Sequence, residues 1–148
     1  MDFAALHDWD LDPRQAVALQ RKLAQQVRLM PTVAESPATV AGVDVSYEKH
    51  GDHFFAVVVV LDFATLTVVD QAWADGWVDF PYIPGLLSFR ELPVLLAAFR
   101  RLKTVPDVVL VDGQGIAHPR RIGLASHLGL WLNLPTVGCA KSRLCGVH

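Results

Sequence analysis

The sequence has no long apolar run and no secretory leader pattern. Although 52% of its 148 residues are hydrophobic, the longest apolar segment, residues 54–61, has only the length of a strand, well short of the roughly 20 residues that cross a membrane. The acidic N-terminus, MDFAALHDWDLD, lacks the basic start and apolar core of a signal peptide. We therefore expect a cytoplasmic protein without a membrane partner.

Cysteines are few, and internal repeats and low-complexity segments are absent. The two cysteines, Cys139 and Cys145, form neither a CxxC pair nor a zinc set. We therefore expect two free thiols that are buried or half-buried. A chain of this length can bury a substantial core, and we expect residues 1–148 to form one domain.

Acidic residues are missing from the last quarter of the chain. The overall net charge of −2 by itself argues against a nucleic-acid partner. Residues 113–148, however, hold four Lys and Arg residues and neither Asp nor Glu, so the first 112 residues carry −6. Such a localised basic patch can hold a polyanion, although four charges on a surface are also commonplace.

The stretch 107–121, DVVLVDGQGIAHPRR, combines an apolar run, an acidic residue, a glycine-rich turn and two arginines. The β-branched run 108–111 predicts a strand covered on both faces. Asp112 then lies at the carboxyl end of that strand, which is where α/β sheets bind ligands. Gly113 lets a phosphate or base approach the backbone closely, and Pro119 predicts the start of a helix.

Two aspartates in these apolar surroundings each have two interpretations. Asp112 beside Arg120 and Arg121 suggests a metal ion that works on a phosphate. The alternative is that Asp112 forms a turn beside solvated arginines. Asp44 lies among valines in the predicted strand 39–47. A buried carboxylate is costly unless it is paired or binds a metal, whereas near a strand end its side chain reaches solvent.

Hydrophobic spacing and turn residues predict three helices and five strands. The helices are expected over residues 13–30, 88–102 and 119–130. The strands are expected over residues 39–47, 53–61, 66–73, 108–111 and 136–140. Tight connections between the first three strands indicate an antiparallel meander. If the last two strands are parallel, Lys141 lies near Asp112 at the same edge of the sheet.

Residues 81–85, PYIPG, interrupt this pattern with two prolines and a glycine. They predict a stiff loop that presents Tyr82 and Ile83. Rigid apolar side chains of this kind can enter a base stack and unstack it. The alternative is a proline-rich connector whose aromatic ring packs on the core.

Structural explanations also exist for Glu91 and for two histidines. Ser88 and Glu91 form a capping-box pattern at a helix start, although Pro93 would fit better if the helix began later. His118 and His127 are nine residues apart, which is not the helical spacing of metal ligands. Structural or surface roles are therefore expected for both histidines.

Four sequence blocks together resemble endonuclease V. They are VAGVDVSY at 40–47, PYIPGLLSFRE at 81–91, VDGQGIAHPRRIGLASHLG at 111–129 and PTVGCAKSRLCG at 135–146. The predicted element order is that of the ribonuclease H-like α/β fold, with three antiparallel strands, then two parallel ones, flanked by helices. The resemblance implies a DNA-repair endonuclease that uses Mg²⁺, with Mn²⁺ as the alternative, recognises deaminated bases, chiefly hypoxanthine (inosine), and cuts on their 3′ side.

The resemblance also implies roles for individual residues. By motif, Asp44, Glu91 and Asp112 are catalytic carboxylates that hold the metal, and Lys141 is catalytic beside the phosphate. Carboxylates from separate elements suit Mg²⁺. Tyr82 falls in a wedge, and the flipped base enters a pocket beside it, at a cost that is smallest for poorly paired bases. The nucleic-acid contacts so assigned are Pro81, Tyr82, Ile83, Pro84, Gly85, Gly113, His118, Arg120 and Lys141.

Bacterial-type members of the family continue past the RLCG block, whereas this chain stops at His148. The resemblance implies that a closing helical region, with a further acidic or histidine metal ligand, is missing. We therefore expect an exposed apolar sheet face. The expected partner is DNA with deaminated bases, or RNA with inosine, and no obligate protein partner is inferred.

Three functions remain open on the sequence. The first is an active nuclease specific for deaminated bases. The second is a catalytically weak or inactive nucleic-acid-binding remnant of that nuclease. The third is another ribonuclease H-like nuclease, such as a structure-specific nuclease of the nucleotide-excision type, which the PYIPG loop disfavours.

Overall fold

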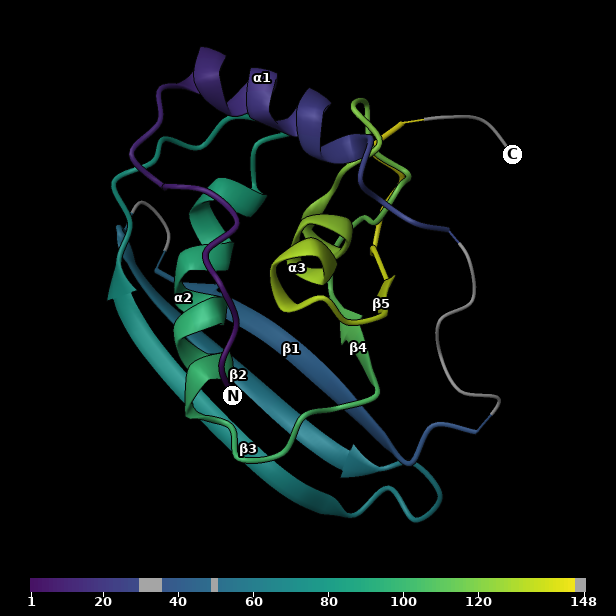
Figure 1. Cartoon of the computed structure of the whole chain (residues 1–148). Helices are drawn as coiled ribbons and strands as arrows, with labels where there is room; N and C mark the ends of the chain where they lie inside the picture. The colour runs from purple at the N-terminus through teal and green to yellow at the C-terminus, as the bar shows by residue number, and fades with distance from the viewer. Residues whose placement is uncertain (30–35, 49–50, 146–148) are drawn as a thin grey trace.

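The computed structural model describes residues 1–29, 36–48 and 51–145, which form a five-stranded sheet and three helices (Figure 1). The helices are α1 (Pro13–Ala24), α2 (Ser88–Arg101) and α3 (Leu124–Leu132). The strands are β1 (Thr39–Tyr47), β2 (His53–Asp62), β3 (Val68–Trp77), β4 (Val108–Val111) and β5 (Thr136–Gly138).

The sheet has the order β3-β2-β1-β4-β5. Strand β1 pairs antiparallel with β2 and parallel with β4, while β2–β3 is antiparallel and β4–β5 parallel. The predicted mixed sheet is therefore confirmed. In the β1–β4 ladder Val43 pairs with Val111, so Asp44 and Asp112 each directly follow the last pair. This register places both aspartates at one edge of the sheet.

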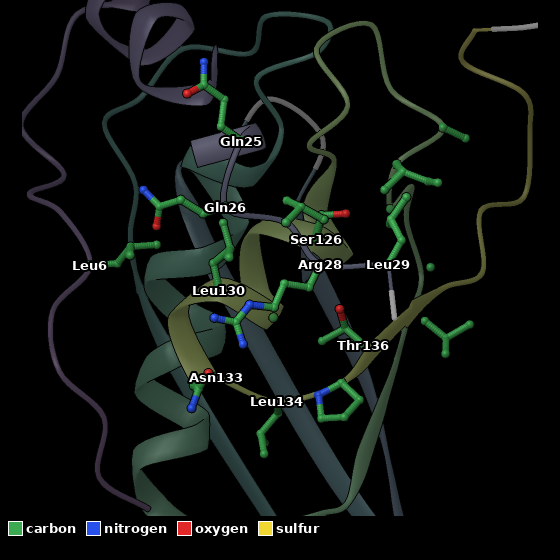
Figure 2. Close-up of a pocket in the computed structure, with 18 residues that line it drawn as sticks. Leu6, Gln25, Gln26, Arg28, Leu29, Ser126, Leu130, Asn133, Leu134 and Thr136 are labelled. Atoms are coloured by element: carbon green, nitrogen blue, oxygen red, sulfur yellow. The ribbon is translucent and has the colours of Figure 1, made fainter. Parts of the chain in front are cut away.

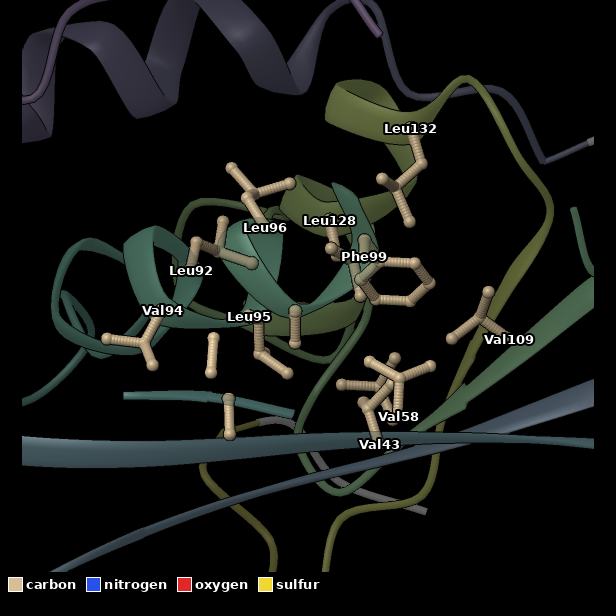
Figure 3. Packing of buried hydrophobic residues seen from close by; sticks show 14 of the residues in the cluster. Val43, Val58, Leu92, Val94, Leu95, Leu96, Phe99, Val109, Leu128 and Leu132 are labelled. Carbon is tan, nitrogen blue, oxygen red and sulfur yellow. The ribbon is translucent and has the colours of Figure 1, made fainter. Parts of the chain in front are cut away.

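The helices all lie over one face of the sheet (Figure 1). Strand β2 alternates accordingly, because Phe54, Ala56, Val58 and Val60 are buried while Phe55 and Val57 are exposed. Helices α2 and α3 bury their apolar faces on that layer, with Leu95, Phe99 and Leu128 fully covered (Figure 3). Each such side chain stabilises the fold by about 1.5–3 kcal/mol through burial.

The opposite face of the sheet is apolar and exposed. Phe55, Trp73 and Trp77 are 47%, 62% and 78% exposed, and no helix among the described residues lies over them. This is the open apolar face that the sequence predicts. In the part of the chain that the structure describes, no helix is long and apolar enough to span a bilayer.

Helix α1 begins as predicted but ends six residues early. The Asp12 carboxylate accepts hydrogen bonds from the Arg14 and Gln15 amides, and the Gln15 side chain closes a capping box. After Ala24 the α-helical hydrogen-bond pattern ends, because the amide of Gln26 donates to the carbonyl of Leu23, three residues back rather than four. Pro31, which was expected to end the helix, lies outside the described residues.

The helix predicted from Pro119 begins only at Leu124, so that prediction is wrong. Arg121 has a left-handed φ of 59°, which ends any helix started at Pro119. Gly123 is the N-cap, and a Cβ there would lie 2.2 Å from the Gln114 carbonyl oxygen. Residues 119–123 are therefore a loop, and its two arginines do not lie at a helix N-terminus.

The capping box predicted at the start of α2 is also wrong. Leu87 is the N-cap, and its side chain makes no capping hydrogen bond, while the hydroxyl of Ser88 bonds His127 Nδ1 at 3.0 Å. The structural explanation for Glu91 therefore does not hold. The helix nevertheless begins at Ser88 as predicted, with Pro93 accommodated inside it.

Three smaller predictions also need correction. The third strand runs over Val68–Trp77 rather than 66–73, because Leu66 takes a left-handed φ of 57° in the preceding turn. The last strand ends at Gly138 rather than at residue 140. Cys139 is exposed, and only Cys145 is half-buried, although both thiols are free as expected.

Candidate functional site

Three carboxylates line one small cavity of about 60 Å³ at the edge of the sheet. Asp44 comes from β1, Glu91 from the first turn of α2, and Asp112 from the end of β4. The rest of the lining is aliphatic and consists of Val43, Val45, Leu95, Val111 and Leu124. The structure therefore brings together the three carboxylates that the sequence motifs single out.

Glu91 is the buried member of this group, with 8% of its surface exposed. Burial raises its pKa to about 7, and the negative charges of Asp44 and Asp112 act in the same direction, against the smaller effect of Arg90. Each of these causes disfavours the charged carboxylate. The cavity therefore has an excess of negative charge that a bound cation would relieve.

Asp44 is exposed, although it lies in the middle of β1. Its cross-strand partner Val57 is 40% exposed, so both residues belong to the open face of the sheet. The cost of burying a carboxylate in an apolar strand therefore does not arise. The alternative interpretation, that the Asp44 side chain reaches solvent, is therefore correct. Asp44 nevertheless also lines the cavity that contains Glu91.

Lys141 lies near Asp112 at the same edge of the sheet, as predicted from the parallel pairing of the last two strands. Its Nζ forms an ion pair of 2.5 Å with Asp112, and this hydrogen bond and charge raise the pKa of Lys141. The Gln114 side chain donates to the Ser142 carbonyl at 3.1 Å and ties this segment to the turn after β4. Within the described ranges, no three His, Cys, Asp or Glu side chains converge tightly enough to form a complete metal site.

The loop 81–85 presents Tyr82 to solvent, with 65% of this residue exposed. The alternative of an aromatic ring packed on the core is therefore wrong. The loop is anchored to the protein interior, since Ile83 packs against the buried cluster of Ala16, Leu86 and Phe89. Just before it, the Arg90 guanidinium donates to the Phe80 carbonyl. A stiff loop thus carries an exposed aromatic ring.

A pocket of about 180 Å³ opens beside Tyr82. This volume suits one small planar group, since pockets for drug-sized ligands have roughly 300–1,000 Å³. The pocket is lined by Gln20, Tyr82, Ile83, Pro84, Gly85, Leu87, Ser88, Gln114, His118, Gly123, Leu124 and Leu144. Of the residues assigned to nucleic-acid contacts, four members of the loop and His118 meet here.

Gly113 is not among the lining residues, which corrects its predicted place in the pocket. It is buried, and a Cβ there would lie 3.1 Å from the side chain of Leu124, which does line the pocket. The lining position belongs to its neighbour Gln114. Gln20 was also missed, although a polar residue on the buried stripe of α1, between Ala16 and Leu23, is a signal that the sequence contains.

His118 and Arg120 act on the loop itself. His118 Nε2 and Arg120 Nη2 both contact the carbonyl oxygen of Gly85, at 3.0 and 2.7 Å. Burial lowers the pKa of His118, and the charge of Arg120 lowers it further against the raising effect of the Gly85 hydrogen bond. The structural role expected for His118 is therefore present at the pocket wall.

Behind the pocket, the N-terminal segment, residues 1–11, runs along α2 and α3 (Figure 1). Its His7 Nε2 lies 2.8 Å from His127 Nε2 and accepts from Trp131 Nε1 at 3.2 Å. Because the indole can only donate, His7 carries its proton on Nδ1 and donates to the Asp8 carbonyl. His127 then donates from Nε2 and accepts from Ser88.

This network makes the fold sensitive to acid. Burial lowers the pKa of His7, and burial with the nearby His7 lowers the pKa of His127 to about 3. Both values lie below the unfolded value of 6.5, so their stabilising effect is complete above that pH and is lost as the pH falls. Below pH 6.5 the neutral His127 then lowers the free energy of unfolding by on the order of 1 kcal/mol per pH unit, and His7 acts in the same direction.

We therefore expect the free energy of unfolding to fall between pH 7 and pH 5. Urea denaturation at both pH values measures this change. The variant His7→Gln keeps an acceptor for Trp131 but does not titrate, so its stability should depend less on pH. An unchanged pH dependence in this variant would mean that the acid sensitivity has another source.

A larger hollow lies elsewhere (Figure 2). This groove of about 1160 Å³ runs between the segment after α1 and the C-terminal half of α3 with β5. Of the described residues that line it, Arg28 is the charged one, and the lining also includes Gln25, Ser126, Asn133 and Thr136. None of the predicted site residues belongs to it, so we do not assign the site to this groove.

The sheet order and the acidic cavity define the class of the protein. Three antiparallel strands followed by two parallel ones, with helices on one face, form the ribonuclease H-like arrangement. Two of its acidic residues, Asp44 and Asp112, directly follow the last paired residues of the neighbouring parallel strands β1 and β4, at the edge where α/β sheets bind ligands.

Comparison with known proteins identifies the family. Residues 21–148 match the family model Endonuclease V. The Endonuclease V of Dehalococcoides mccartyi is 52% identical over 143 residues, which cover 97% of this chain and 64% of that protein. That of Gloeobacter violaceus is 54% identical over 144 residues, which cover 96% and 58%. The chain belongs to the Endonuclease V family.

Solved structures agree with this assignment. The crystal structure of Endonuclease V from Streptomyces avermitilis superposes with a TM-score of 0.85 at 48% identity, over 90% of this chain and 59% of that one. Endonuclease V from Ciona intestinalis, crystallised with a DNA that contains an inosine followed by a ribo-adenosine, gives 0.70 at 32% identity, over 85% and 56%. The chain spans about three fifths of the length of these relatives.

Proposed function

We propose that this chain acts on nucleic acid as an endonuclease that recognises deaminated bases, chiefly hypoxanthine, and cuts the DNA strand on their 3′ side. One observation carries the proposal: a cavity lined by three carboxylates lies on the same molecule as an exposed Tyr82 beside a pocket for one small planar group. Cytoplasmic localisation, expected from the N-terminal sequence, belongs to the same proposal.

The residues of the cavity fit Mg²⁺, with Mn²⁺ as the alternative. Carboxylate oxygens are the ligands that these ions prefer, and the repulsion that raises the pKa of Glu91 favours a cation between them. Asp44, Glu91 and Asp112 would hold the ion. When bound, it would stabilise the charge on the attacking and leaving oxygens of the phosphodiester. Lys141, now paired with Asp112, would contact the phosphate.

Tyr82 and the pocket would provide lesion recognition. The exposed ring would enter the base stack, and the extruded base would occupy the pocket beside it. Extrusion costs a few kcal/mol and costs least for a poorly paired base, which supplies a preference for deaminated bases. The polar groups of Gln114 and His118 in the lining could then contact the edge of the base.

We expect Tyr82→Ala to lower the preference for inosine-containing strands. Stacking of a base on an aromatic ring contributes about 1–3 kcal/mol, which corresponds to a factor of about 5 to 150. The ratio of cleavage rates on inosine-containing and normal strands measures the effect. Tyr82→Phe keeps the ring and should keep the ratio. If alanine leaves the ratio unchanged, Tyr82 is only a surface aromatic.

A nicking assay in Mg²⁺, repeated in Mn²⁺, tests the proposed function directly. The substrates are an end-labelled DNA strand with one inosine, the same strand without inosine, and the RNA equivalent of each. Cleavage 3′ of the inosine would support the proposal, and the RNA arm would give the preferred backbone. Equal cutting of inosine-free DNA would contradict it and would favour a nuclease that recognises structure instead.

A second candidate function is a binding remnant that recognises inosine without cutting. One observation favours it: the described part of the chain lacks a complete metal-ligand cluster. Binding of the inosine strand without cleavage in either metal would support this candidate. The family match gives no such support to a nuclease of the nucleotide-excision type.

A further inference from the structure

Three side-chain donors converge on the carbonyl oxygen of Gly85. Gln20 Nε2 donates to it at 3.0 Å, Arg120 Nη2 at 2.7 Å, and His118 Nε2 lies at 3.0 Å. Gly85 has a left-handed φ of 82°, and a Cβ there would lie 2.8 Å from Arg120 Nη2. Glycine thus permits the close approach that holds the end of the loop 81–85.

Gln20 reaches this point from a different part of the chain, helix α1. Its side chain is 1% exposed, and both ends of its amide are engaged: Nε2 bonds Gly85, and Oε1 accepts from Arg120 Nε at 2.5 Å. A buried amide is costly unless it is hydrogen-bonded, and here both bonds go to groups at the pocket. Gln20 therefore links the loop to Arg120.

The neutral side chain of Gln20 also preserves a positive charge. Within the described ranges, no carboxylate lies at ion-pair distance from Arg120, whose contacts are the amide oxygen of Gln20 and the carbonyl of Gly85. The guanidinium is thus fixed in place but not neutralised. A fixed, unneutralised cation beside the pocket is suited to a backbone phosphate.

We propose that Gln20 is a positioning residue for lesion recognition, which holds the loop 81–85 in the conformation that presents Tyr82. The inference rests on the proposed function. Tyr82 is mostly exposed, so its position depends on how firmly its loop is held. A loop fixed before binding does not lose conformational entropy when DNA binds, and the bond from Gln20 contributes to that order.

The test compares two substitutions at Gln20 with a matched control. Gln20→Leu removes both hydrogen bonds at similar size. Gln20→Glu keeps the acceptor for Arg120 but cannot donate to Gly85. Gln25→Leu replaces an exposed glutamine at the end of the same helix. We expect both Gln20 variants to lower the inosine-to-normal ratio about tenfold, which corresponds to 1.4 kcal/mol, and the control to leave it unchanged.

Two measurements separate positioning from a merely structural role. The first is the ratio of cleavage rates on inosine-containing and normal DNA. The second is the fluorescence of 2-aminopurine placed beside the inosine, measured in EDTA, which reports unstacking without cleavage. We expect a smaller fluorescence rise in both Gln20 variants, and melting temperatures will show whether each variant is folded. If the leucine variant does not fold, the glutamate variant decides.

The outcomes distinguish this inference from the proposed function. If the wild-type chain neither cuts nor binds inosine-containing DNA in preference to normal DNA, both are overturned. If it has that preference and the Gln20 variants keep the same ratio and fluorescence change, only the role of Gln20 is overturned. An equal loss of rate on both strands, with an unchanged ratio, would likewise make Gln20 merely structural.

Discussion

Asp112→Ala should abolish strand cleavage while binding to inosine-containing DNA remains. The substitution removes one of the three carboxylates around the cavity and would leave the proposed metal ion with two of its ligands. Loss of an outer partner of a metal ligand already costs about 10–100-fold, so we expect the loss of a direct ligand to exceed 100-fold. Binding persists because Lys141, released from its ion pair, remains available for phosphates.

Single-turnover cleavage in Mg²⁺ and DNA binding in EDTA measure the two effects separately. Asp10→Ala is the matched control, because it removes an exposed carboxylate of the N-terminal segment with the same change in net charge. Undiminished Mg²⁺-dependent cleavage by Asp112→Ala would remove Asp112 from the site. A parallel loss of binding would show that the carboxylate maintains the pocket instead.

Phe99→Ala should cost about 3–5 kcal/mol of the free energy of unfolding. Phe99, on α2, is fully buried in the hydrophobic core cluster that also contains Val109 and Leu128 (Figure 3). The substitution leaves a cavity that the surrounding side chains only partly fill. Since small proteins are stable by about 5–15 kcal/mol in total, a large share of the molecules could unfold.

Urea denaturation of the wild type and the variant measures this cost. Phe63→Ala is the matched control, because Phe63 is 48% exposed and its loss should cost less than about 1 kcal/mol. Equal costs for the two phenylalanines would mean that the core around Phe99 relaxes to fill the space. Helix α2, which carries Glu91, would then be able to shift more than the burial of Phe99 suggests.

The sheet and the acidic edge follow from local sequence patterns. Strands such as 39–47 and 108–111 were predicted correctly, because apolar alternation and short β-branched runs are properties of neighbouring residues. The meeting of Asp112 and Lys141 was also predicted, because parallel strands place their carboxyl ends at one edge. One topological rule was therefore sufficient for this part of the site.

The pocket could not be predicted in the same way, because it depends on contacts between distant segments. The left-handed Arg121 and the contact of Gly123 with the Gln114 carbonyl convert a predicted helix into the loop beside the pocket. Ser88 matched a capping pattern, but its hydroxyl forms a hydrogen bond with His127, 39 residues further along the chain, instead. Such tertiary contacts override local propensity and leave no trace in short windows of sequence.

The packing of the N-terminal segment has a practical consequence for shortened versions of the protein. The family match begins at Arg21, and a fragment cut there would keep every carboxylate of the cavity. It would lose the hydrogen bond from Gln20 to the Gly85 carbonyl. It would also lose Trp9, whose ring stacks on that of Trp131 with 5.2 Å between the ring centroids. A boundary chosen by homology alone would thus keep the carboxylates of the cavity but remove contacts that hold the loop 81–85 and helix α3 in place.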